Sequence, residues 1–385
     1  MDNYQLSTIN SQLPKDWEIR KLGEVFKLKS GDGLTAKNMI EGQYPVFGGN
    51  GIAGYHNQFN SENEVIIGRV GALCGNVRKI NTKFWLTDNA FRISKGLEYF
   101  NSNFVVYMLN YKDLRSFARQ AAQPVISNSS LKDVLIKFPK SIEEQKRIVS
   151  ILDHAFEAID KAKVNAEQNL KNAKELFESY LQGVFENKGD DWEEDRLKNV
   201  CELKSGTTIS PSLERNEGDV LYTKVRDMNL PENEVEINTS SRFVNSNEIK
   251  TNQIIPEGAI IFPKRGGAIA TNKKRKIVSP TIVDLNTMAI IPSKKIDKNY
   301  FFHWFQLFDL KSISNGANIP QINNYSFDDV YIPYPKSIKE QQIIVRQLDA
   351  LSAETKKLES IYQQKIDDFE ELKKSVLQKA FNGEL

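Results

Sequence analysis

The segment Asp133–Ile142 reads DVLIKFPKSI, and nearly the same segment, DVYIPYPKSI, returns at Asp329–Ile338. An earlier pair repeats as well, because WEIRKLGEVFKLKSG at Trp17–Gly31 matches WEEDRLKNVCELKSG at Trp192–Gly206 at eight of fifteen positions. The first pair is offset by 196 residues and the second by 175, so the second copy carries 21 additional residues in its middle. We interpret the chain as one long unit written twice with a variable middle, not as a solenoid of short repeats.

The residue composition changes once within each copy. The first part is rich in Gly, Pro, Asn and aromatic residues, and it contains short β-type runs bounded by turn residues, such as Gly258–Phe262. The second part, residues 143–183 and 339–381, contains no Pro and is rich in residues that favour helix. The pattern predicts an α+β fold of two similar globules, each followed by a long helix. The expected boundaries are 1–142 and 189–338 for the globules, 143–188 for the first helix with its linker, and 339–385 for the second helix.

Both helical segments carry a heptad pattern with alternating spacings of four and three. In the second segment the pattern comprises Ile344, Leu348, Leu351, Thr355, Leu358, Tyr362, Lys365, Phe369, Leu372 and Val376. The same positions of the first segment hold smaller residues, namely Ile148, Leu152, Ala155, Ile159, Ala162, Ala166, Asn169, Ala173, Leu176 and Tyr180. This spacing is typical of a coiled coil. We expect the two helices to pair antiparallel within the chain, as the spacer of a pseudo-twofold duplication. The alternative is that each helix packs only on its own globule.

Two short signals mark where these helices begin. Ser141 is followed three residues later by Glu144, and Ser337 is followed by Glu340. A serine and a glutamate at this spacing predict a capping box, in which each side chain bonds a backbone N–H of the first turn.

Charge and cysteine content exclude several classes of protein. The chain has 52 basic and 50 acidic side chains, so it does not coat nucleic acid by bulk charge, although a local basic face remains compatible with this balance. Its two cysteines, Cys74 and Cys201, form no disulfide framework or zinc cluster, which favours a reducing cytoplasm. The start has no basic region before an apolar core, and no run approaches 18 apolar residues, so we expect neither a signal peptide nor a membrane span.

Motifs that carry catalytic chemistry are absent from the sequence. There is no G-x-x-x-x-G-K-[ST] loop, and the three histidines lack metal-ligand spacing. The stretch Gly49–Gly54 fits G-x-G-x-x-G, but the next residues, Tyr55–Asn60, do not read as a helix, so we interpret the stretch as a glycine-rich turn. His303 lies in the aromatic run Tyr300–Phe305 and is expected to pack in the core. These absences predict a chain that is not an enzyme by itself.

The most uneven charge is at Lys264–Lys276, which holds six basic side chains and no acidic one. Its lysines and arginines suit phosphates, and its glycines allow close approach, so the run predicts contact with a nucleic-acid backbone. A solvated hairpin tip is the alternative interpretation. Residues whose amides could read base edges are Asn50, Asn57, Asn89, Gln120, Gln123, Asn315, Asn318 and Gln321.

Three further stretches carry a resemblance to a known family. The first copy contains YPVFGGNGIAGY at Tyr44–Tyr55 and IIGRVGALCGNV at Ile66–Val77, and the second contains VLYTKVRDM at Val220–Met228. Both copies close with Pro-x-x-x-x-Glu-Gln at the start of the long helix. In their doubled order these motifs cover nearly the whole chain, which resembles the specificity subunit of a type I restriction–modification system.

The resemblance implies a function and a set of partners. Each globule would be a target recognition domain that reads one half of a bipartite, asymmetric site in double-stranded DNA. The helices would act as a spacer and would dock two methyltransferase subunits, with restriction motor–nuclease subunits completing the complex. S-adenosylmethionine, ATP and Mg²⁺ would be bound by those partners, and this chain would need no cofactor. The alternatives are a stand-alone DNA-modifying or DNA-cleaving enzyme with a cryptic site, and a coiled-coil scaffold that binds no nucleic acid.

Basic and amide side chains in the two variable middles, together with one tyrosine, are the candidate DNA-binding residues. They are Asn50, Tyr55, Arg69, Arg78, Lys79, Asn89, Arg92, Lys224, Arg226, Lys264, Arg265, Lys273, Lys274, Arg275, Lys276 and Asn318.

Overall fold

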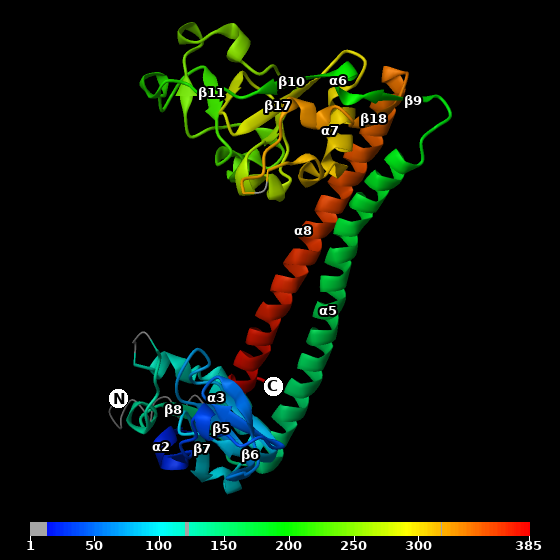
Figure 1. Ribbon diagram of the computed structural model, residues 1–385. Helices are drawn as coiled ribbons and strands as arrows, with labels where there is room; N and C mark the ends of the chain where they lie inside the picture. Colours follow the sequence, from blue (N-terminus) through cyan, green and yellow to red (C-terminus); the bar gives the residue numbers. More distant parts are fainter. Residues whose placement is uncertain (1–13, 120–122, 317) are drawn as a thin grey trace. The chain divides into compact units, whose positions relative to one another are not determined.

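The computed structural model describes residues 14–119, 123–316 and 318–385. The chain divides into two compact units. The first unit comprises residues 14–167 with Gln363–Leu385, and the second comprises Gln168–Tyr362. Each unit contains β-sheets and short helices together with parts of the two long helices, as can be followed in Figure 1. The predicted α+β class is confirmed.

The described residues of the first unit form eight strands and three short α-helices before the first long helix. The strands are β1 (Trp17–Lys21), β2 (Lys27–Ser30), β3 (Tyr44–Gly48), β4 (Gly51–His56), β5 (Ser61–Gly68), β6 (Val77–Leu86), β7 (Ala90–Lys95) and β8 (Leu135–Pro139). The helices are α2 (Leu22–Val25), α3 (Ser102–Tyr111), α4 (Asn128–Leu131) and the start of α5 (Ile142–Glu186).

The second unit repeats this order with more strands. The strands are β9 (Trp192–Arg196), β10 (Cys201–Ser205), β11 (Val220–Thr223), β12 (Glu236–Ile237), β13 (Phe243–Val244), β14 (Ile260–Pro263), β15 (Arg275–Ile277), β16 (Thr281–Val283), β17 (Thr287–Pro292) and β18 (Tyr331–Pro335). The helices are α6 (Leu197–Val200), α7 (Lys298–Leu307) and the start of α8 (Ile338–Asn382).

The main sheets of the two units share one topology. The first unit has the order β2-β7-β5-β6-β3, and the second has β10-β17-β14-β15-β12. In both sheets the first three pairings are antiparallel and the last is parallel. The first unit adds β4 at the edge, whereas the second builds a separate three-stranded sheet, β13-β11-β16. The longer middle of the second copy therefore adds a sheet without changing the shared one, and the predicted internal duplication is confirmed.

The repeated segments pair with each other in space. Strand β1 pairs antiparallel with β8 so that Trp17 faces Pro139, and β9 pairs with β18 so that Trp192 faces Pro335. Each of these two-stranded sheets runs directly into a long helix. The start of each copy is thereby fixed beside the start of its own long helix.

The long helices begin at Ile142 and Ile338, directly after the serines that were expected to cap them. Ser141 Oγ accepts a hydrogen bond from the backbone N–H of Glu144 at 3.3 Å. The carboxylate of Glu144, however, binds the guanidinium of Arg147 at 2.7 Å. The serine half of that capping box is confirmed, and the glutamate instead supports the helix surface.

The two long helices pair antiparallel, as predicted. In the first unit Lys163 Nζ lies 2.5 Å from Glu370 Oε1, and Lys373 forms an ion pair with Asp160, so the order of contacts along one helix is reversed along the other. The α5 side chains Leu152, Ile159, Ala166 and Ala173, spaced by seven, are all buried. This spacing is that of one heptad position.

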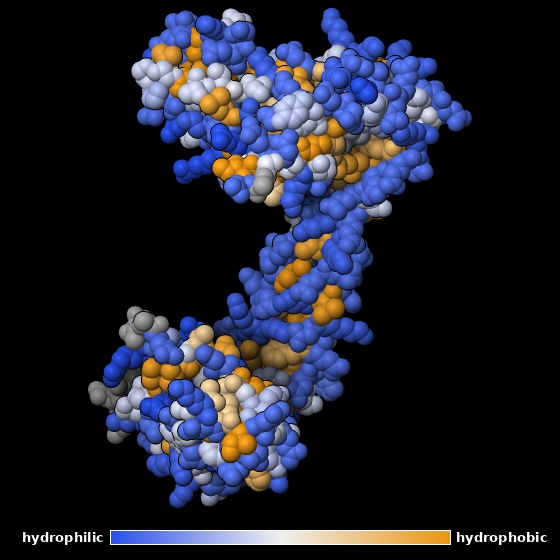
Figure 2. Space-filling view, in the orientation of Figure 1, coloured by the Kyte–Doolittle hydropathy of each residue, from blue (hydrophilic) through white to orange (hydrophobic). Residues whose placement is uncertain are grey.

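The second predicted position of each heptad is more open than expected. Leu176, Leu358 and Leu372 are 49%, 37% and 46% exposed. Figure 2 shows apolar side chains at the surface of the helices. A regular coiled-coil seam buries both positions, so the seam is incompletely closed at these residues. Helix α5 thus buries one stripe, whereas in α8 Leu348 and Thr355 are buried and Phe369 and Val376 are half-buried.

Each globular core is completed by the end of the helix that begins in the other unit. In the first unit Phe381 of α8 packs among Phe104 and Leu152, with ring centroids of Phe104 and Phe381 5.6 Å apart. In the second unit Phe185 of α5 packs against Tyr300 at 5.3 Å. These contacts exclude the alternative in which each helix packs only on its own globule.

Candidate nucleic-acid interface

A basic residue follows the same strand in both units. Strand β5 is followed by Arg69, whose Nη1 lies 3.5 Å from Ser30 Oγ at the end of β2. Strand β14 is followed by Lys264, whose Nζ lies 3.0 Å from Ser205 Oγ at the end of β10. The backbone confirms the equivalence, because the N–H of Arg69 donates to Asn89 and that of Lys264 donates to Asn286. The duplication thus places a cation directly after the equivalent central strand of each sheet.

In each unit a segment from later in the chain contacts the basic residue at this strand end. An isolated β-bridge joins Arg119 to Val125 in the first unit, and another joins Asn315 to Gln321 in the second. The residue after each bridge binds the basic position, since the N–H of Ile126 donates to the carbonyl of Arg69 at 2.9 Å, and that of Ile322 donates to Lys264 at 2.8 Å. The sequence separates these segments by about fifty residues, and only the fold brings them together.

We call these clusters the first and second strand-end sites. The first comprises Ser30, Arg69, Asn89, Arg119 and Val125. The second comprises Ser205, Lys264, Arg265, Asn286, Asn315 and Gln321.

The first strand-end site combines cations with open space. The guanidinium of Arg69 lies over the Phe91 ring at 5.3 Å and donates to the carbonyl of Asp88 at 3.2 Å. Its Nε–H is buried and has no hydrogen-bond partner among the described residues. A cavity of about 650 Å³ lies between Arg69, Phe117 and Arg119. Buried guanidinium donors beside a cavity favour an anionic acceptor such as a phosphate.

The second strand-end site has a partly desolvated cation. Burial lowers the pKa of Lys264, and the carboxylate of Asp284 opposes this shift. Arg265, the next residue, is exposed, and its bridge to Gln321 places it beside an amide side chain. The site therefore offers both a charge for the backbone of a nucleic acid and hydrogen-bonding groups for its bases.

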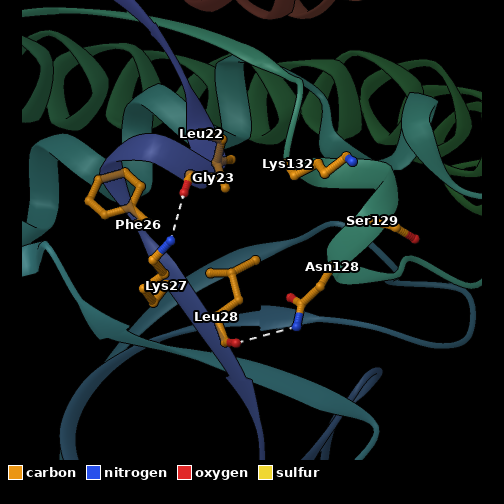
Figure 3. Close-up of a pocket in the computed structure, with 8 residues that line it drawn as sticks. All are labelled: Leu22, Gly23, Phe26, Lys27, Leu28, Asn128, Ser129 and Lys132. Atoms are coloured by element: carbon orange, nitrogen blue, oxygen red, sulfur yellow. Dashed lines mark hydrogen bonds between the residues drawn. The ribbon is translucent and has the colours of Figure 1, made fainter.

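A smaller pocket of about 280 Å³ lies where α2, β2 and α4 meet in the first unit (Figure 3). Two of its polar side chains are engaged with the wall, because Lys27 Nζ donates to Gly23 and Asn128 Nδ2 donates to Leu28, each to a carbonyl at 3.3 Å. Its remaining lining is largely apolar, from residues such as Leu22 and Phe26. We do not assign this pocket to the interface.

Of the glycine-rich stretch, Gly49 and Asn50 form the turn between β3 and β4, as expected from the sequence, whereas Gly51–Gly54 are part of β4. Gly51 has φ of +103°, and a Cβ on Gly49 would lie 1.9 Å from the carbonyl oxygen of Val70, so both positions require glycine. Asn50 is exposed, and its Oδ1 accepts from the N–H of Leu73 at 3.0 Å. Tyr55 on β4 is 55% exposed.

Three predicted basic residues of the first unit have internal partners or partial burial. Arg92 is only 14% exposed and lies 3.6 Å from Glu64 Oε1, so its charge is compensated inside the sheet. Arg78 Nε donates to Asn76 Oδ1 at 2.6 Å, and Lys79 is half-buried on β6. Of the predicted set in this unit, Arg69 and Asn89 are the residues that the fold brings together.

The predicted residues of the second unit before β14 are spread over separate loops. Lys224 Nζ lies 3.1 Å from Glu214 Oε1 and over the Tyr222 ring, whereas Arg226 is exposed. Asn318 is exposed in the loop between Asn315 and Gln321. The predicted base-edge residue Gln120 lies outside the described residues.

The basic run Lys264–Lys276 is not one continuous surface. Lys274 is 1% exposed, and it occupies the position that Val77 fills in the first unit, since Arg275 and Arg78 take the same register against β14 and β5. Its Nζ donates to the carbonyl of Phe308 at 2.6 Å. Burial lowers the pKa of Lys274 to about 7. Lys274 therefore does not belong to a DNA-facing surface, contrary to the expectation from its sequence.

The rest of the run is also held by protein groups. Lys276 Nζ lies 2.8 Å from Glu236 Oε1, and Lys273 bonds the side chain of Asn229. Arg275 is half-buried and donates to the carbonyl of Met228 at 3.3 Å. Lys264 and Arg265, at the start of the run, are the part that belongs to the second strand-end site.

Several site residues were not selected from sequence. Ser30 and Ser205 are the middle residues of the repeated Lys-Ser-Gly triplets, so the duplication itself marked them. Nothing in the sequence marks Asn286 as a site residue, because only its backbone bond to Lys264 places it there. Within the described ranges no group of three or more His, Cys, Asp and Glu side chains could hold a metal ion, and no helix is long and apolar enough to cross a membrane.

Two segments of the chain match one family of known proteins. The family model described as the type I restriction modification DNA specificity domain matches residues 14–171 and again residues 189–367. The two matches fall on the two copies read from the sequence.

Individual relatives agree with this. The chain is 37% identical over 140 residues to the specificity subunit of the type I restriction enzyme EcoprrI of Escherichia coli, a match covering 35% of this chain and 34% of that protein. It is 23% identical to the MjaVIII specificity subunit of Methanocaldococcus jannaschii, covering 97% and 94% of the two chains.

Solved structures share the fold. A structure titled for complex assembly and conformational transition of the type I R-M system matches with a TM-score of 0.78 at 17% identity, covering 97% of this chain and 99% of that one. The HsdS subunit from Thermoanaerobacter tengcongensis matches with a TM-score of 0.64 at 18% identity, covering 97% and 98%. With its duplicated domain and its full-length relatives, the chain belongs to the family of type I restriction–modification specificity subunits, the non-catalytic members of these systems.

Proposed function

We propose that this chain reads a bipartite, asymmetric DNA site, with one half-site bound by each unit, and that it leaves the chemistry to partner subunits. The observation that carries the proposal is the equivalence of the two strand-end sites. In each unit a basic side chain lies beside a serine at the equivalent strand ends of the equivalent sheet. The pairs are Arg69 with Ser30 and Lys264 with Ser205. Backbone phosphates are contacted by such cations irrespective of sequence, which suits a feature that both copies retain.

The side chains around the two basic positions differ, which favours an asymmetric target. The later segment that contacts the basic residue presents Arg119 and Val125 in the first unit but Asn315 and Gln321 in the second. Sequence is read through hydrogen bonds and apolar contacts to base edges, so two different sets select two different half-sites.

Docking of partners is proposed for the stripe of the long helices that remains open. Leu176, Leu358 and Leu372 are apolar and substantially exposed. The partners would be two methyltransferase subunits, which use S-adenosylmethionine, and restriction motor–nuclease subunits, which use ATP and Mg²⁺. Apolar side chains at a helix surface are typical of a protein interface of this kind.

Selection from a library of random duplex DNA tests the reading function. The chain assembled with its methyltransferase subunits should enrich two short sequences separated by a fixed spacer. Arg69→Ala should weaken binding to all sequences in similar proportion and reduce the dependence on salt concentration, because a phosphate contact releases counterions. Enrichment of a single uninterrupted sequence would contradict the proposal.

The stand-alone enzyme is the alternative, and the purified chain decides between them. Incubated alone with DNA, and with S-adenosylmethionine or Mg²⁺, the chain should neither methylate nor cut. Either product from the chain alone would favour the alternative.

The spacer role has its own test. Insertion of seven residues after Ala166, with a matching insertion after Tyr362, keeps the buried heptad position of both helices in register. The preferred distance between half-sites should change while both half-sites remain the same. A changed half-site with an unchanged distance would contradict a spacer role.

A further inference from the structure

The bridged residue pairs at the two strand-end sites share one backbone arrangement and carry different side chains. In the first unit the N–H of Arg119 donates to the carbonyl of Val125 at 3.0 Å. In the second unit the N–H of Asn315 donates to the carbonyl of Gln321 at the same distance, and the reverse bond is 2.8 Å. Both pairs are antiparallel bridges at an offset of 196 residues. The scaffold therefore holds two neighbouring positions in place and leaves their chemistry free to differ.

The second unit surrounds this pair with further polar groups. Gln321 Nε2 lies 3.3 Å from Asn323 Oδ1, and Asn315 Nδ2 lies 3.4 Å from the hydroxyl of Tyr325. These contacts are long for N–H···O hydrogen bonds, so they orient the amides and are easily exchanged for a ligand. Asn323 itself is held more firmly, because its backbone N–H donates to Ser326 Oγ at 3.1 Å at the start of the 3₁₀-helix η11 (Asn324–Phe327), and its side chain donates a 2.9 Å bond to the hydroxyl of Tyr325.

Charge and exposure place the pair where DNA would lie under the proposed function. Asn315 is exposed, and Tyr325 is 62% exposed. Arg265, also exposed, is bridged to Gln321 and can hold a phosphate while the amides face the bases. An amide that offers a donor and an acceptor in one plane matches the N6 and N7 edge of adenine, whereas a guanidinium matches O6 and N7 of guanine.

We propose that the bridged pair is a specificity-determining position, at which Asn315 and Gln321 read adenine in the half-site of the second unit and Arg119 reads guanine in that of the first. This inference rests on the proposed function and goes beyond it by naming the base. Asn323 and Tyr325 act as positioning residues for the two amides.

Exchange of the pair tests the proposal in the assembled complex. Asn315→Arg with Gln321→Val transfers the first unit's side chains to the second, and a library of random duplex DNA reports the base preference. Adenine should give way to guanine at one position of one half-site, with a change in relative affinity of about 10- to 100-fold. The other half-site and the spacer length should stay unchanged.

Two further variants complete the test. Gln321→Glu keeps the shape of the side chain but replaces its donor by an acceptor, so it should lose the adenine preference at that position even if the exchange variant does not fold. Ser312→Arg adds the same charge three residues from the bridge, and it should raise affinity for all sequences without altering any base preference.

The outcomes separate this inference from the proposed function. If the unaltered complex selects a bipartite site and both Gln321→Glu and the exchange variant select the same bases, the inference is overturned and the proposed function stands. A change of base preference in the other half-site would overturn the inference as well. If the unaltered complex selects no specific DNA, the proposed function itself fails.

Discussion

The two units place different side chains at equivalent positions of the fold. Val77 in the first unit corresponds to the buried Lys274 in the second, and Tyr107 corresponds to His303. The hydroxyl of Tyr107 donates to Asp153 at 2.6 Å, and His303 Nε2 lies 2.8 Å from Asp349. The carboxylate on the long helix is retained, and its partner on the short helix is not. The two copies therefore make contacts at the same positions but through different side chains.

Contacts at the start of the long helices have stayed the same. Gln145 is buried, donates to the carbonyl of Pro139 at 3.0 Å and accepts from the N–H of Asn101 at 2.8 Å. Gln341 is buried in the same way, donating to Pro335 at 2.9 Å and accepting from Asp297 at 2.7 Å. This amide ties strand, long helix and short helix together, which explains the repeated Glu-Gln of the sequence.

The largest expected effect tests the reciprocal cores. Phe381→Ala removes a ring that stacks on Tyr111 at 5.1 Å in the first unit, and Phe185→Ala removes its counterpart against Tyr300 in the second. Each substitution should lower the free energy of opening by about 3–5 kcal/mol, because it leaves a cavity in a packed core. Hydrogen exchange resolved by peptide should show the loss for Phe381→Ala in residues 14–167 and for Phe185→Ala in the second globule. Loss in the unit where each helix begins would contradict this arrangement.

The next effect concerns the buried lysine. In the second unit the ammonium of Lys274 is received by backbone carbonyls at the end of α7. In the first unit the carbonyl of Asn110, the counterpart of Gln306, already accepts from the N–H of Asp113 at 3.1 Å. Val77 lies buried in the apolar core of that unit, so Val77→Lys should lower its stability by roughly 3 kcal/mol, since it places a charge among apolar side chains.

Lys274→Met is the matched control for this substitution. Replacing a buried charge by an apolar side chain of similar volume is often neutral or stabilising, so the second unit should change by less than about 1 kcal/mol. Hydrogen exchange under identical conditions compares the two variants. Equal tolerance of lysine at both positions would show that the helix end is not what accommodates Lys274.

Sequence reasoning succeeded where a residue acts on its near neighbours. The spacing of Leu152, Ile159 and Ala166 along one helix predicted the long pair, and Ser141 predicted its start. It failed for Lys274, because a run of lysines and arginines conceals which side chain points inward until strand register is known. It could not assemble the strand-end sites either, because Arg69 meets the loop at Val125 only after the sheet has formed.

Replacing either of the two equivalent glutamines, Gln145 and Gln341, should have a smaller effect, of about the same size in both units. Gln145→Ala leaves the N–H of Asn101 and the carbonyl of Pro139 without their partner, and Gln341→Ala does the same at Asp297 and Pro335. Each should cost about 2 kcal/mol, because buried polar groups lose hydrogen bonds. Thermal and denaturant unfolding of both variants measure it. A large difference between the two would mean that the joint is not the conserved part of the duplication.

The smallest expected effect is a difference between the two units in how their stability depends on pH. Burial lowers the pKa of His303 from its ordinary 6.5, while Asp349 and Asp297 oppose the shift and Lys276 adds to it. The unfolded chain therefore takes up a proton at a higher pH than the folded second unit. Stability of that unit is fully present above about pH 6.5 and falls as the pH drops toward the lowered value. In the first unit burial raises the pKa of Tyr107, so this position does not titrate in the same window.

Exchanging the two residues isolates this pH dependence from that of all other groups. His303→Tyr should remove part of the acid sensitivity of the second unit, about 1 kcal/mol or less between pH 7 and 5, and Tyr107→His should introduce it into the first. Hydrogen exchange at several pH values, corrected for the intrinsic rate, gives the opening free energy of each unit. If His303→Tyr left the slope of the second unit unchanged, the acid sensitivity would have to come from carboxylates, and the divergence at this pair would be one of packing alone.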